Sequence, residues 1–306
     1  MLISQAKSGG SWGGFAPQHL LGKSTEALGL GKKKSKMHEK AYKNLDFLNS
    51  PAARLIRIQC EYSEPEDRFR RLGVEDTIVM YGSARTLSTR VATLRHTDAV
   101  SALAKATKSN KAELEAELKV AEGKLANSRY YDETRELAQR LTRWGMTRPG
   151  GREYLIATGG GPGIMEAGNR GASDVEGGRS VGLGISLPFE ERLNQYVTKE
   201  LGFIFHYFFM RKYWFMYLAK AMIVLPGGFG TMDELFELLT LRQTGKVTKQ
   251  LPIVLYGKAY WDKVLNLQAM VDYGTIAKAD MDMFFTTDSV DEAYDFVTKG
   301  LRKTWG

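Results

Sequence analysis

The feature that most constrains the fold of this 306-residue chain is a repeated pairing of a short apolar run with a glycine-containing turn. The three pairs are Thr77–Tyr81 with Gly82-Ser83-Ala84-Arg85, Tyr154–Thr158 with Gly159-Gly160-Gly161-Pro162-Gly163, and Ala221–Leu225 with Pro226-Gly227-Gly228-Phe229-Gly230-Thr231. Apolar runs without polar alternation are typical of parallel strands covered on both faces. Helix-like segments separate these runs, which predicts an α/β fold with a Rossmann-like, doubly wound parallel sheet flanked by helices. Ligands of such sheets bind beyond the carboxyl ends of the strands, where these turns lie.

The remaining periodic segments extend this pattern. Further strands are expected at Ser180–Leu187, Phe203–Phe208 and Pro252–Tyr256, the last clear strand, after which helices close the chain. Helices are expected at Tyr130–Trp144, Met210–Ala219 and Met232–Arg242. The chain contains no internal repeat.

Composition divides the chain into three parts. Residues 1–36 are rich in Gly, Ser and Lys and are expected to be a disordered basic tail. Residues 37–75 are expected to form a helical extension, with a helix starting at Ser50-Pro51. Residues 76–306 are expected to form the Rossmann-like domain, in which residues 86–127 are an exposed helical insertion.

Charge and cysteine content exclude several classes of protein. Eight lysines and two glutamates within residues 1–43 account for most of the net charge of +8, so the charge is weak evidence for a nucleic-acid-binding domain. A single cysteine, Cys60, rules out a disulfide framework and fits a cytoplasmic protein. The four histidines form no HExxH-type pair, so no metal site is expected. The most apolar region, Leu201–Leu225, contains three basic residues, which argues against a membrane span.

The turn at residues 159–163 is a candidate phosphate site. Glycine lets the backbone approach a ligand closely, and the following helix would point unpaired N–H groups at the turn. Its spacing matches neither GxGxxG nor a P-loop, so neither a dinucleotide nor a nucleoside triphosphate is indicated. The alternative is a tight turn without a ligand, but four glycines in five residues exceed what a turn needs.

The turn after the third strand repeats this pattern, and a carboxylate follows it. Thr231 is expected at the N-cap of the next helix, where its hydroxyl would cap the helix or bind phosphate. Glu234 follows in the first turns of that helix, where a carboxylate is either a complement to the helix dipole or part of the chemistry.

Two adjacent cations, Arg211 and Lys212, lie within the most aromatic stretch of the chain. An arginine can hold a phosphate or ribose oxygen with two hydrogen bonds. The alternative is that both side chains extend to solvent at a helix end.

Together these motifs resemble those of the LOG ("Lonely Guy") family of nucleotide phosphoribohydrolases, which older annotation often labels lysine decarboxylases. GGGPGIM at residues 159–165, the Arg-Lys pair, and PGGFGTMDE at residues 226–234, similar to the family's PGGxGTxxE, carry the resemblance. It covers roughly residues 75–300, and the extension and the insertion are similar to those of the longer bacterial members.

The resemblance implies a nucleoside 5′-monophosphate phosphoribohydrolase, which cleaves AMP or a related or N6-modified (cytokinin-type) nucleotide to free base and ribose 5-phosphate. It implies that Arg211 and Glu234 are catalytic. Substrate-binding positions would be Ser83, Gly159, Gly160, Gly161, Gly163, Glu190, Lys212, Gly227, Gly228, Phe229, Gly230, Thr231, Met232, Asp233 and Thr240. Glu191 competes with Glu190 for one position, and Phe209 replaces a histidine of the compact members, which leaves the accepted base open.

Two other functions stay open. One is a nucleotide- or cofactor-binding protein without catalysis, although the presence of both Arg211 and Glu234 favours an enzyme. The other is pyridoxal-phosphate-dependent decarboxylation, for which the sequence identifies no Schiff-base lysine. No cofactor is expected. The partners expected are a small-molecule nucleotide and a second copy of the chain, because the aromatic segment Phe203–Tyr217 exceeds what one helix of a monomer commonly buries.

Overall fold

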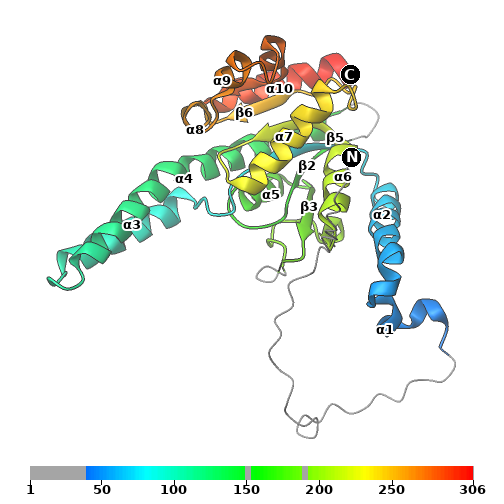
Figure 1. Ribbon diagram of the computed structural model, residues 1–306, viewed down its shortest axis with the longest axis horizontal. Helices are drawn as coiled ribbons and strands as arrows, with labels where there is room; N and C mark the ends of the chain where they lie inside the picture. The colour runs from blue at the N-terminus through cyan, green and yellow to red at the C-terminus, as the bar shows by residue number, and fades with distance from the viewer. Residues whose placement is uncertain (1–38, 149–152, 188–191, 306) are drawn as a thin grey trace, which may run out of the picture. The chain divides into compact units, whose positions relative to one another are not determined.

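The computed structural model of the chain describes residues 39–148, 153–187 and 192–305 (Figure 1). The chain divides into two compact units, Met1–Ser50 and Pro51–Gly306. In the described part of the first unit, a 3₁₀ turn, η1 (Ala41–Lys43), precedes the one-turn helix α1 (Leu45–Leu48). The Asn44 side chain caps α1 by accepting a hydrogen bond from the backbone N–H of Phe47 at 3.0 Å. The expected tail, residues 1–36, lies outside the described residues.

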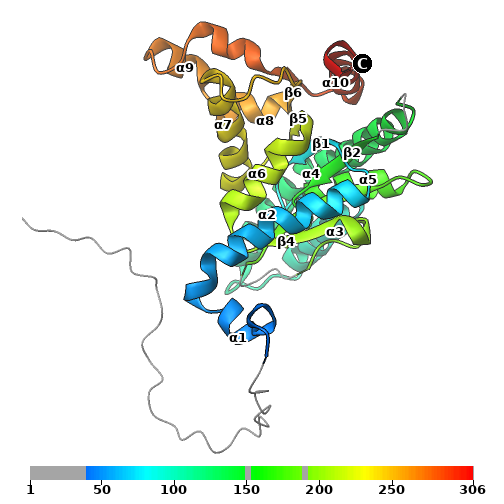
Figure 2. The same cartoon turned by 90° about the vertical axis from the view of Figure 1, so that its right-hand side faces the viewer.

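The second unit contains a seven-stranded sheet in which every neighbouring pair of strands is parallel (Figures 1 and 2). The strands are β1 (Asp76–Tyr81), β2 (Tyr154–Thr158), β3 (Ser180–Ile185), β4 (Gly202–Phe205), β5 (Ala219–Val224), β6 (Ile253–Tyr256) and β7 (Phe285–Thr287). Their order is β4-β3-β2-β1-β5-β6-β7, so the chain builds outward from β1 in one direction and then returns to start again at β5. The predicted doubly wound α/β fold is confirmed.

Helices cover both faces of this sheet. They are α2 (Arg54–Arg71), α3 (Thr89–Ala104), α4 (Lys111–Met146), α5 (Ile164–Ser173), α6 (Phe208–Leu218), α7 (Phe229–Gln243), α8 (Lys258–Val264), α9 (Leu267–Asp272) and α10 (Val290–Trp305). Short 3₁₀ turns, η2 (Pro51–Ala53), η4 (Lys199–Leu201) and η5 (Lys278–Met283), connect some of them. Within the described residues, no helix has the length and apolar content that a membrane span requires.

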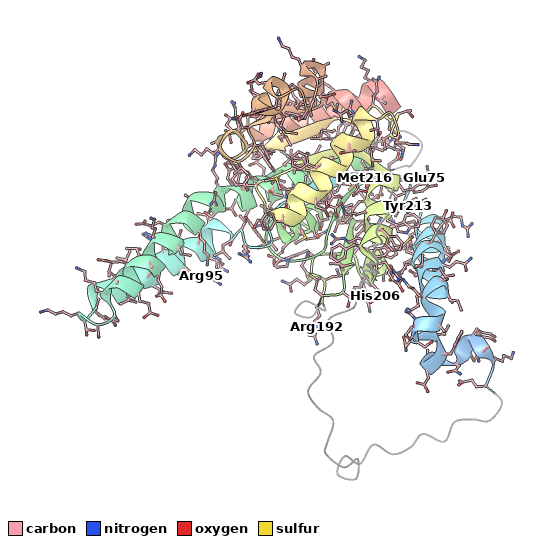
Figure 3. All side chains as sticks on the ribbon, viewed as in Figure 1. Glu75, Arg95, Arg192, His206, Tyr213 and Met216 are labelled. Atoms are coloured by element: carbon pink, nitrogen blue, oxygen red, sulfur yellow. The ribbon has the colours of Figure 1, made fainter. Side chains whose placement is uncertain are left out.

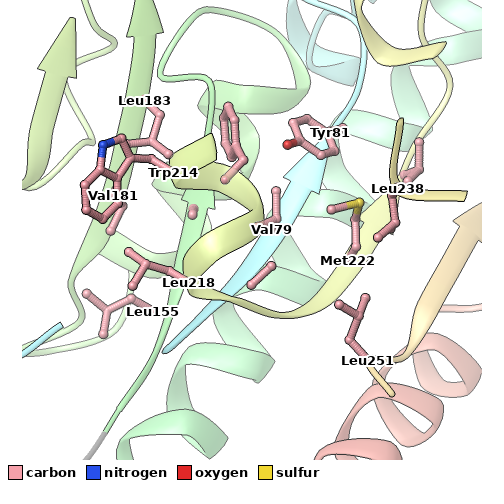
Figure 4. Packing of buried hydrophobic residues seen from close by; sticks show 14 of the residues in the cluster. Val79, Tyr81, Leu155, Val181, Leu183, Trp214, Leu218, Met222, Leu238 and Leu251 are labelled. Carbon is pink, nitrogen blue, oxygen red and sulfur yellow. The ribbon is translucent and has the colours of Figure 1, made fainter. Parts of the chain in front are cut away.

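Alternate residues of each strand point into two separate hydrophobic cores. On one face Ile78 and Met80 of β1 pack against α4, α5 and α10. On the other face Val79 and Tyr81 pack with side chains of α2, α6, α7 and α8, among them Trp214 (Figure 4). Because both faces are buried, the strands carry continuous apolar runs, which is why the sequence pattern identified them.

The helices of residues 86–127, expected as an exposed helical insertion, do not end where that insertion was expected to end. One helix, α4, runs without interruption from Lys111 to Met146, so the amphipathic helix predicted at Tyr130–Trp144 is its C-terminal part. α3 packs against the N-terminal part of α4, and the pair extends from the sheet as a hairpin on which Arg95 lies (Figures 1 and 3). Good helix formers fill residues 111–127, so no break separates an insertion from the helix that packs on the sheet.

The end of the sheet also differs from expectation. β7 follows the strand that the sequence pattern indicated as the last clear one, and it pairs with β6 through Val254 and Phe285. This three-residue strand lies at the sheet edge, where only one neighbouring strand is available, and its Phe-Thr-Thr sequence is too short to show a period.

Candidate functional site

The three glycine-containing turns lie side by side at the carboxyl ends of β2, β1 and β5. The backbone N–H of Ser83 donates to the carbonyl of Pro226 at 3.0 Å, and the carbonyl of Ser83 accepts from the N–H of Ile164 at 3.0 Å. The turn after β1 is therefore hydrogen-bonded to the other two turns. Since β1 and β5 are neighbours while the chain leaves them in opposite directions, this is the switch point at which open α/β sheets bind ligands.

A cavity of about 640 Å³ opens at these turns, within the range usual for small-molecule sites. Residues 82–85, 159 and 227–232, which come from the three turns and the start of α7, line it. Its other lining residues are Tyr81, Met165, Arg211, Phe215, Glu234, Tyr260 and Val264. The predicted site residues Ser83, Gly159, Gly227, Gly228, Phe229, Gly230, Thr231 and Met232 thus share one cavity with Arg211 and Glu234.

Arg211 and Glu234 form an ion pair within this cavity. Nη2 of Arg211, on α6, lies 3.2 Å from Oε1 of Glu234, on α7. Only 15% of the Arg211 side chain and 2% of the Glu234 side chain are exposed. Helix α6 follows β4 and helix α7 follows β5, so the two residues meet because both helices cover the same face of the sheet.

Several buried polar atoms in the cavity have no hydrogen-bond partner among the described residues. They are Oε2 of Glu234, Nε of Arg211 and the hydroxyl of Tyr81. Buried polar atoms are nearly always hydrogen-bonded, and an unpaired one costs about 1–3 kcal/mol. All three atoms belong to residues that line the cavity, so unsatisfied polar groups are concentrated at this site.

The carboxyl group of Glu234 has a strongly shifted pKa. Burial raises the pKa of Glu234 to about 7, although the positive charges of Arg211 and Lys212 oppose the shift. Burial, with the negative charge of Glu234, also raises the pKa of the Tyr81 hydroxyl well above 10. A carboxyl group with a pKa near neutrality can accept or donate a proton under physiological conditions, and such groups cluster at catalytic sites.

This shift has a consequence for stability. The folded chain binds the proton of Glu234 more tightly than the unfolded chain, whose carboxyl pKa is near 4.5. Stability should therefore fall as the pH rises from about 4.5 to about 7, by an amount on the order of 3 kcal/mol, and then level off. Glu234→Gln removes the titration. We expect its melting temperature, relative to wild type, to be more favourable at pH 8 than at pH 5.

Thermal unfolding of both proteins at the two pH values measures this difference. Glu176→Gln, which replaces an exposed carboxylate in a turn, is the matched control and should show no such change. An equal difference between Glu234→Gln and wild type at pH 5 and pH 8 would contradict the expectation.

The turn at residues 159–163 contributes to the site in two ways. Gly159 lines the cavity, and Gly161 lines an adjoining one of about 400 Å³, as does Arg192 (Figure 3). Gly160 and Gly163 instead adopt positive φ angles of 70° and 69° and pack closely against neighbouring segments. Gly159 and Gly161 are therefore placed to meet a ligand, whereas Gly160 and Gly163 allow the turn to form.

A buried amide network that the sequence did not indicate supports this turn. The side chain of Asn194 donates to the carbonyls of Gly160 and Gly161, each at 3.0 Å. It also donates at 2.9 Å to Oδ1 of Asn169, which is fully buried. Because Asn194 bonds the backbone at both Gly160 and Gly161, it holds the turn in one conformation.

The N-cap of the helix that follows β5 differs from the one expected. Gly228, not Thr231, is the N-cap of α7, and Thr231 lies inside the first helical turn. The helix begins within the glycine-rich turn itself, and the Thr231 side chain packs against Gly227, where an added Cβ would lie 2.6 Å from Cβ of Thr231. The hydroxyl of Tyr260 donates to the carbonyl of Gly227 at 2.7 Å and fixes the turn from α8.

Besides Gly160, Gly161 and Gly163, four more predicted site residues do not line the cavity or lie outside the described part. The ammonium of Lys212 lies 2.8 Å from carboxylate oxygens of both Asp233 and Glu237. Neither Lys212 nor Asp233 lines the cavity, and Thr240 is an exposed residue farther along α7. Glu190 and its competitor Glu191 lie outside the described residues.

The cavity includes residues that the sequence analysis did not single out, among them Arg85, Met165 and Tyr260. Arg85 is the last residue of the turn that follows β1, and this place in a ligand-binding turn is the sequence signal that could have identified it. Tyr260 is far from every glycine turn in sequence, and no motif marks it.

The aromatic segment around α6 is partly buried within the chain itself. Trp214 and Phe215 are buried in the core, whereas Phe208, Phe209 and Tyr217 are each about half exposed. The expected second copy of the chain stays a prediction.

Comparison with known proteins supports the resemblance. A family model described as "Possible lysine decarboxylase" matches residues 165–297, which include α6, the turn after β5 and α7. The match supports a place among the LOG/lysine-decarboxylase-like proteins and suggests an enzyme. The search of curated proteins gave no match.

The name of that family raises the question of pyridoxal phosphate. Such enzymes bind the cofactor through a lysine Schiff base. Among the described residues, no lysine lines the 640 Å³ cavity or the adjoining 400 Å³ cavity. The nearest candidate by sequence, Lys212, is held by two carboxylates. These two cavities therefore supply no Schiff-base lysine from the described part of the chain, and no step of a mechanism is derived through this cofactor.

Proposed function

We propose that the chain hydrolyses the N-glycosidic bond of a nucleoside 5′-monophosphate, AMP or a related purine nucleotide, to give free base and ribose 5-phosphate. The observation that carries the proposal is the buried Arg211–Glu234 pair, with a carboxyl pKa near 7, in the same cavity as the glycine turn at the start of α7. The match to the LOG-like family is consistent with it.

The glycine turn would bind the 5′-phosphate. The first N–H groups of a helix have no partner within the helix, and the helix dipole favours an anion there. Residues 227–230 bring such groups of α7 to the cavity wall. Binding the phosphate there would hold the ribose in a fixed position, so that part of the barrier is met by orientation.

Glu234 would then act on the ribose. As the C1′–N bond breaks, its electron pair leaves with the base, and positive charge develops on the sugar. The Glu234 carboxylate would stabilise this charge and take a proton from the attacking water, whose oxygen forms the new bond to C1′. The proton that Glu234 takes from water would then pass to the departing base, which regenerates the carboxylate. Arg211 would hold Glu234 in place and balance negative charge in the cavity.

Direct turnover tests this proposal. Purified protein is incubated with AMP, GMP, IMP, CMP, UMP and N6-isopentenyl-AMP, and chromatography follows free base and ribose 5-phosphate. We expect equimolar release of both products from at least one purine nucleotide. A protein that binds these nucleotides but releases no base would refute the hydrolase and support the non-catalytic nucleotide-binding protein.

We also propose that the chain functions as a dimer, with the exposed aromatic side chains of α6 in the interface. Phe208, Phe209 and Tyr217 support this, because one helix exposes three large aromatic side chains and exposed apolar surface marks interaction sites.

A further inference from the structure

We propose that Glu61, on helix α2, is a positioning residue of the site, because it fixes the start of α6 and thereby holds Arg211 against Glu234. This inference rests on the proposed function, in which Arg211 and Glu234 are the pair that acts on the nucleotide. It assigns a role to α2 (Arg54–Arg71), which the proposed mechanism does not use and which lies outside the family match at residues 165–297.

Helix α6, which carries Arg211, depends on its neighbours for its conformation. It has only 11 residues, Phe208–Leu218, and more than half of them are aromatic. Isolated helices shorter than about 12–15 residues are marginal in water, and aromatic residues are modest helix formers. The side chain of its N-cap, Tyr207, makes no capping hydrogen bond. The first turn, on which Arg211 lies, therefore needs support from outside the helix.

The carboxylate of Glu61 supplies this support. Its Oε1 accepts a hydrogen bond from the backbone N–H of His206 at 2.6 Å, and its Oε2 accepts one from the N–H of Tyr207 at 3.2 Å. Hydrogen bonds to a carboxylate are roughly twice as strong as those between neutral groups, and negative charge is favourable at a helix N-terminus. The carbonyl of Tyr207 accepts in turn from the N–H of Arg211 at 3.2 Å. A single residue thus links the Glu61 carboxylate to the backbone of Arg211.

A second hydrogen bond joins Glu61 to α6 beyond Arg211, where the two helices lie side by side (Figures 1 and 2). Pro65 lies inside α2 and has no N–H, so the carbonyl of Glu61, four residues earlier, lacks its usual helical partner. The indole N–H of Trp214 donates to this carbonyl at 3.0 Å. The Trp214 ring is buried and lies 5.4 Å from that of Phe69 of α2. Glu61 therefore binds α6 on both sides of Arg211.

The position of Arg211 matters because its charge acts on the carboxyl group of Glu234. Burial raises the pKa of Glu234 to about 7, and the positive charge of Arg211, whose Nη2 lies 3.2 Å from Oε1, opposes this rise. The other titratable groups that interact with this carboxyl group come from α6, α7 and β1, and they are Lys212, Asp233, Glu237 and Tyr81. Loosening the start of α6 should therefore raise the pKa of Glu234 further, by about one pH unit.

Glu61→Ala tests the proposal with two measurements on the full chain. The pKa of Glu234 is followed by ¹³C NMR of protein labelled at the glutamate carboxyl carbons, and its signal is assigned by its absence in Glu234→Gln. We expect this pKa to be about one pH unit higher than in wild type. Removal of the Glu61 charge alone would act in the opposite direction, because a negative charge raises the pKa of a nearby carboxyl group.

Steady-state kinetics with AMP give the second measurement. In Glu61→Ala, kcat should fall about tenfold or more, because small displacements of a positioned group are costly. KM should change only a few-fold, since the substitution leaves unchanged the turn at residues 227–230, where we propose that the phosphate binds. A variant that is merely less stable would show neither this split nor a new pKa in its folded state.

Two further variants complete the test. Glu61→Gln keeps one side-chain oxygen that can accept from His206 or Tyr207, so its kcat and its Glu234 pKa should lie between those of wild type and Glu61→Ala. Glu66→Ala removes a carboxylate from an exposed position of the same helix and should match wild type in both.

The outcomes separate the role of Glu61 from the hydrolase itself. An unchanged or lowered pKa of Glu234 in Glu61→Ala, or equal effects of Glu61→Ala and Glu66→Ala, would overturn the positioning role. If Glu61→Ala does not fold, the comparison of Glu61→Gln with wild type decides, and equal pKa values there would overturn it. Absence of AMP turnover in the wild type would refute the hydrolase for this nucleotide, whereas the pKa comparison needs no turnover.

Discussion

Glu234→Gln is expected to lower kcat for base release by about a thousandfold or more, while KM for the nucleotide changes only a few-fold. Glutamine has the same shape as protonated glutamate, but it cannot accept a proton from water or carry negative charge opposite a developing cation. Losses of general base catalysis and of an electrostatic stabiliser each commonly cost 10²–10⁴ in rate. The substitution leaves the backbone of residues 227–230, which we propose binds the phosphate, unchanged, so binding should persist.

The wild-type pH profile checks the same residue independently. If ionised Glu234 is the reactive form, kcat should fall as the pH drops below about 7, because burial raises the pKa of Glu234 to about 7. Glu237→Gln is the matched control. It changes a carboxylate one turn later on α7 that pairs with Lys212 and does not line the cavity. Retained turnover in Glu234→Gln, or a loss of the same size in Glu237→Gln, would show that the assignment of Glu234 is wrong.

The fold could be predicted from the sequence because its signals are local. Each buried parallel strand is a short apolar run, and each turn contains glycine where the backbone must turn sharply, as at Gly163. The elements that escaped prediction lack such signals. β7 has three residues. α4 continues across residues 127–130, Asn-Ser-Arg-Tyr, which are mostly modest helix formers and give no local signal of a continuous helix.

The site could be predicted only in part. Arg211 and Glu234 are 23 residues apart in the sequence and lie on different helices, yet their side chains are 3.2 Å apart. In the sequence, only the resemblance to a family linked the two residues. The pKa of Glu234 and the unpaired hydroxyl of Tyr81 depend on burial by side chains from several elements. A single sequence does not encode that burial in any local pattern.

Gly163→Ala is expected to destabilise the fold by about 3 kcal/mol or more and to disrupt the site with it. Gly163 has φ 69° and ψ −129°, a conformation that only glycine adopts readily. An added Cβ would also lie 2.6 Å from the backbone carbon of Ala84. That backbone cannot easily move away, because Ser83 is hydrogen-bonded to both Pro226 and Ile164. The strain would therefore pass into all three turns that form the cavity.

Urea unfolding measures this loss, and Gly177→Ala is its control. Gly177 also has a positive φ, 72°, but an added Cβ there would meet only the Met146 side chain, at an ordinary distance of 3.5 Å. Its cost should be about 1–2 kcal/mol, from the backbone conformation alone. A difference between the two variants measures how tightly the turn after β2 is fixed against the turn after β1. Equal losses would mean that these turns can separate, and that Gly163 is retained for contact with a ligand instead of for packing.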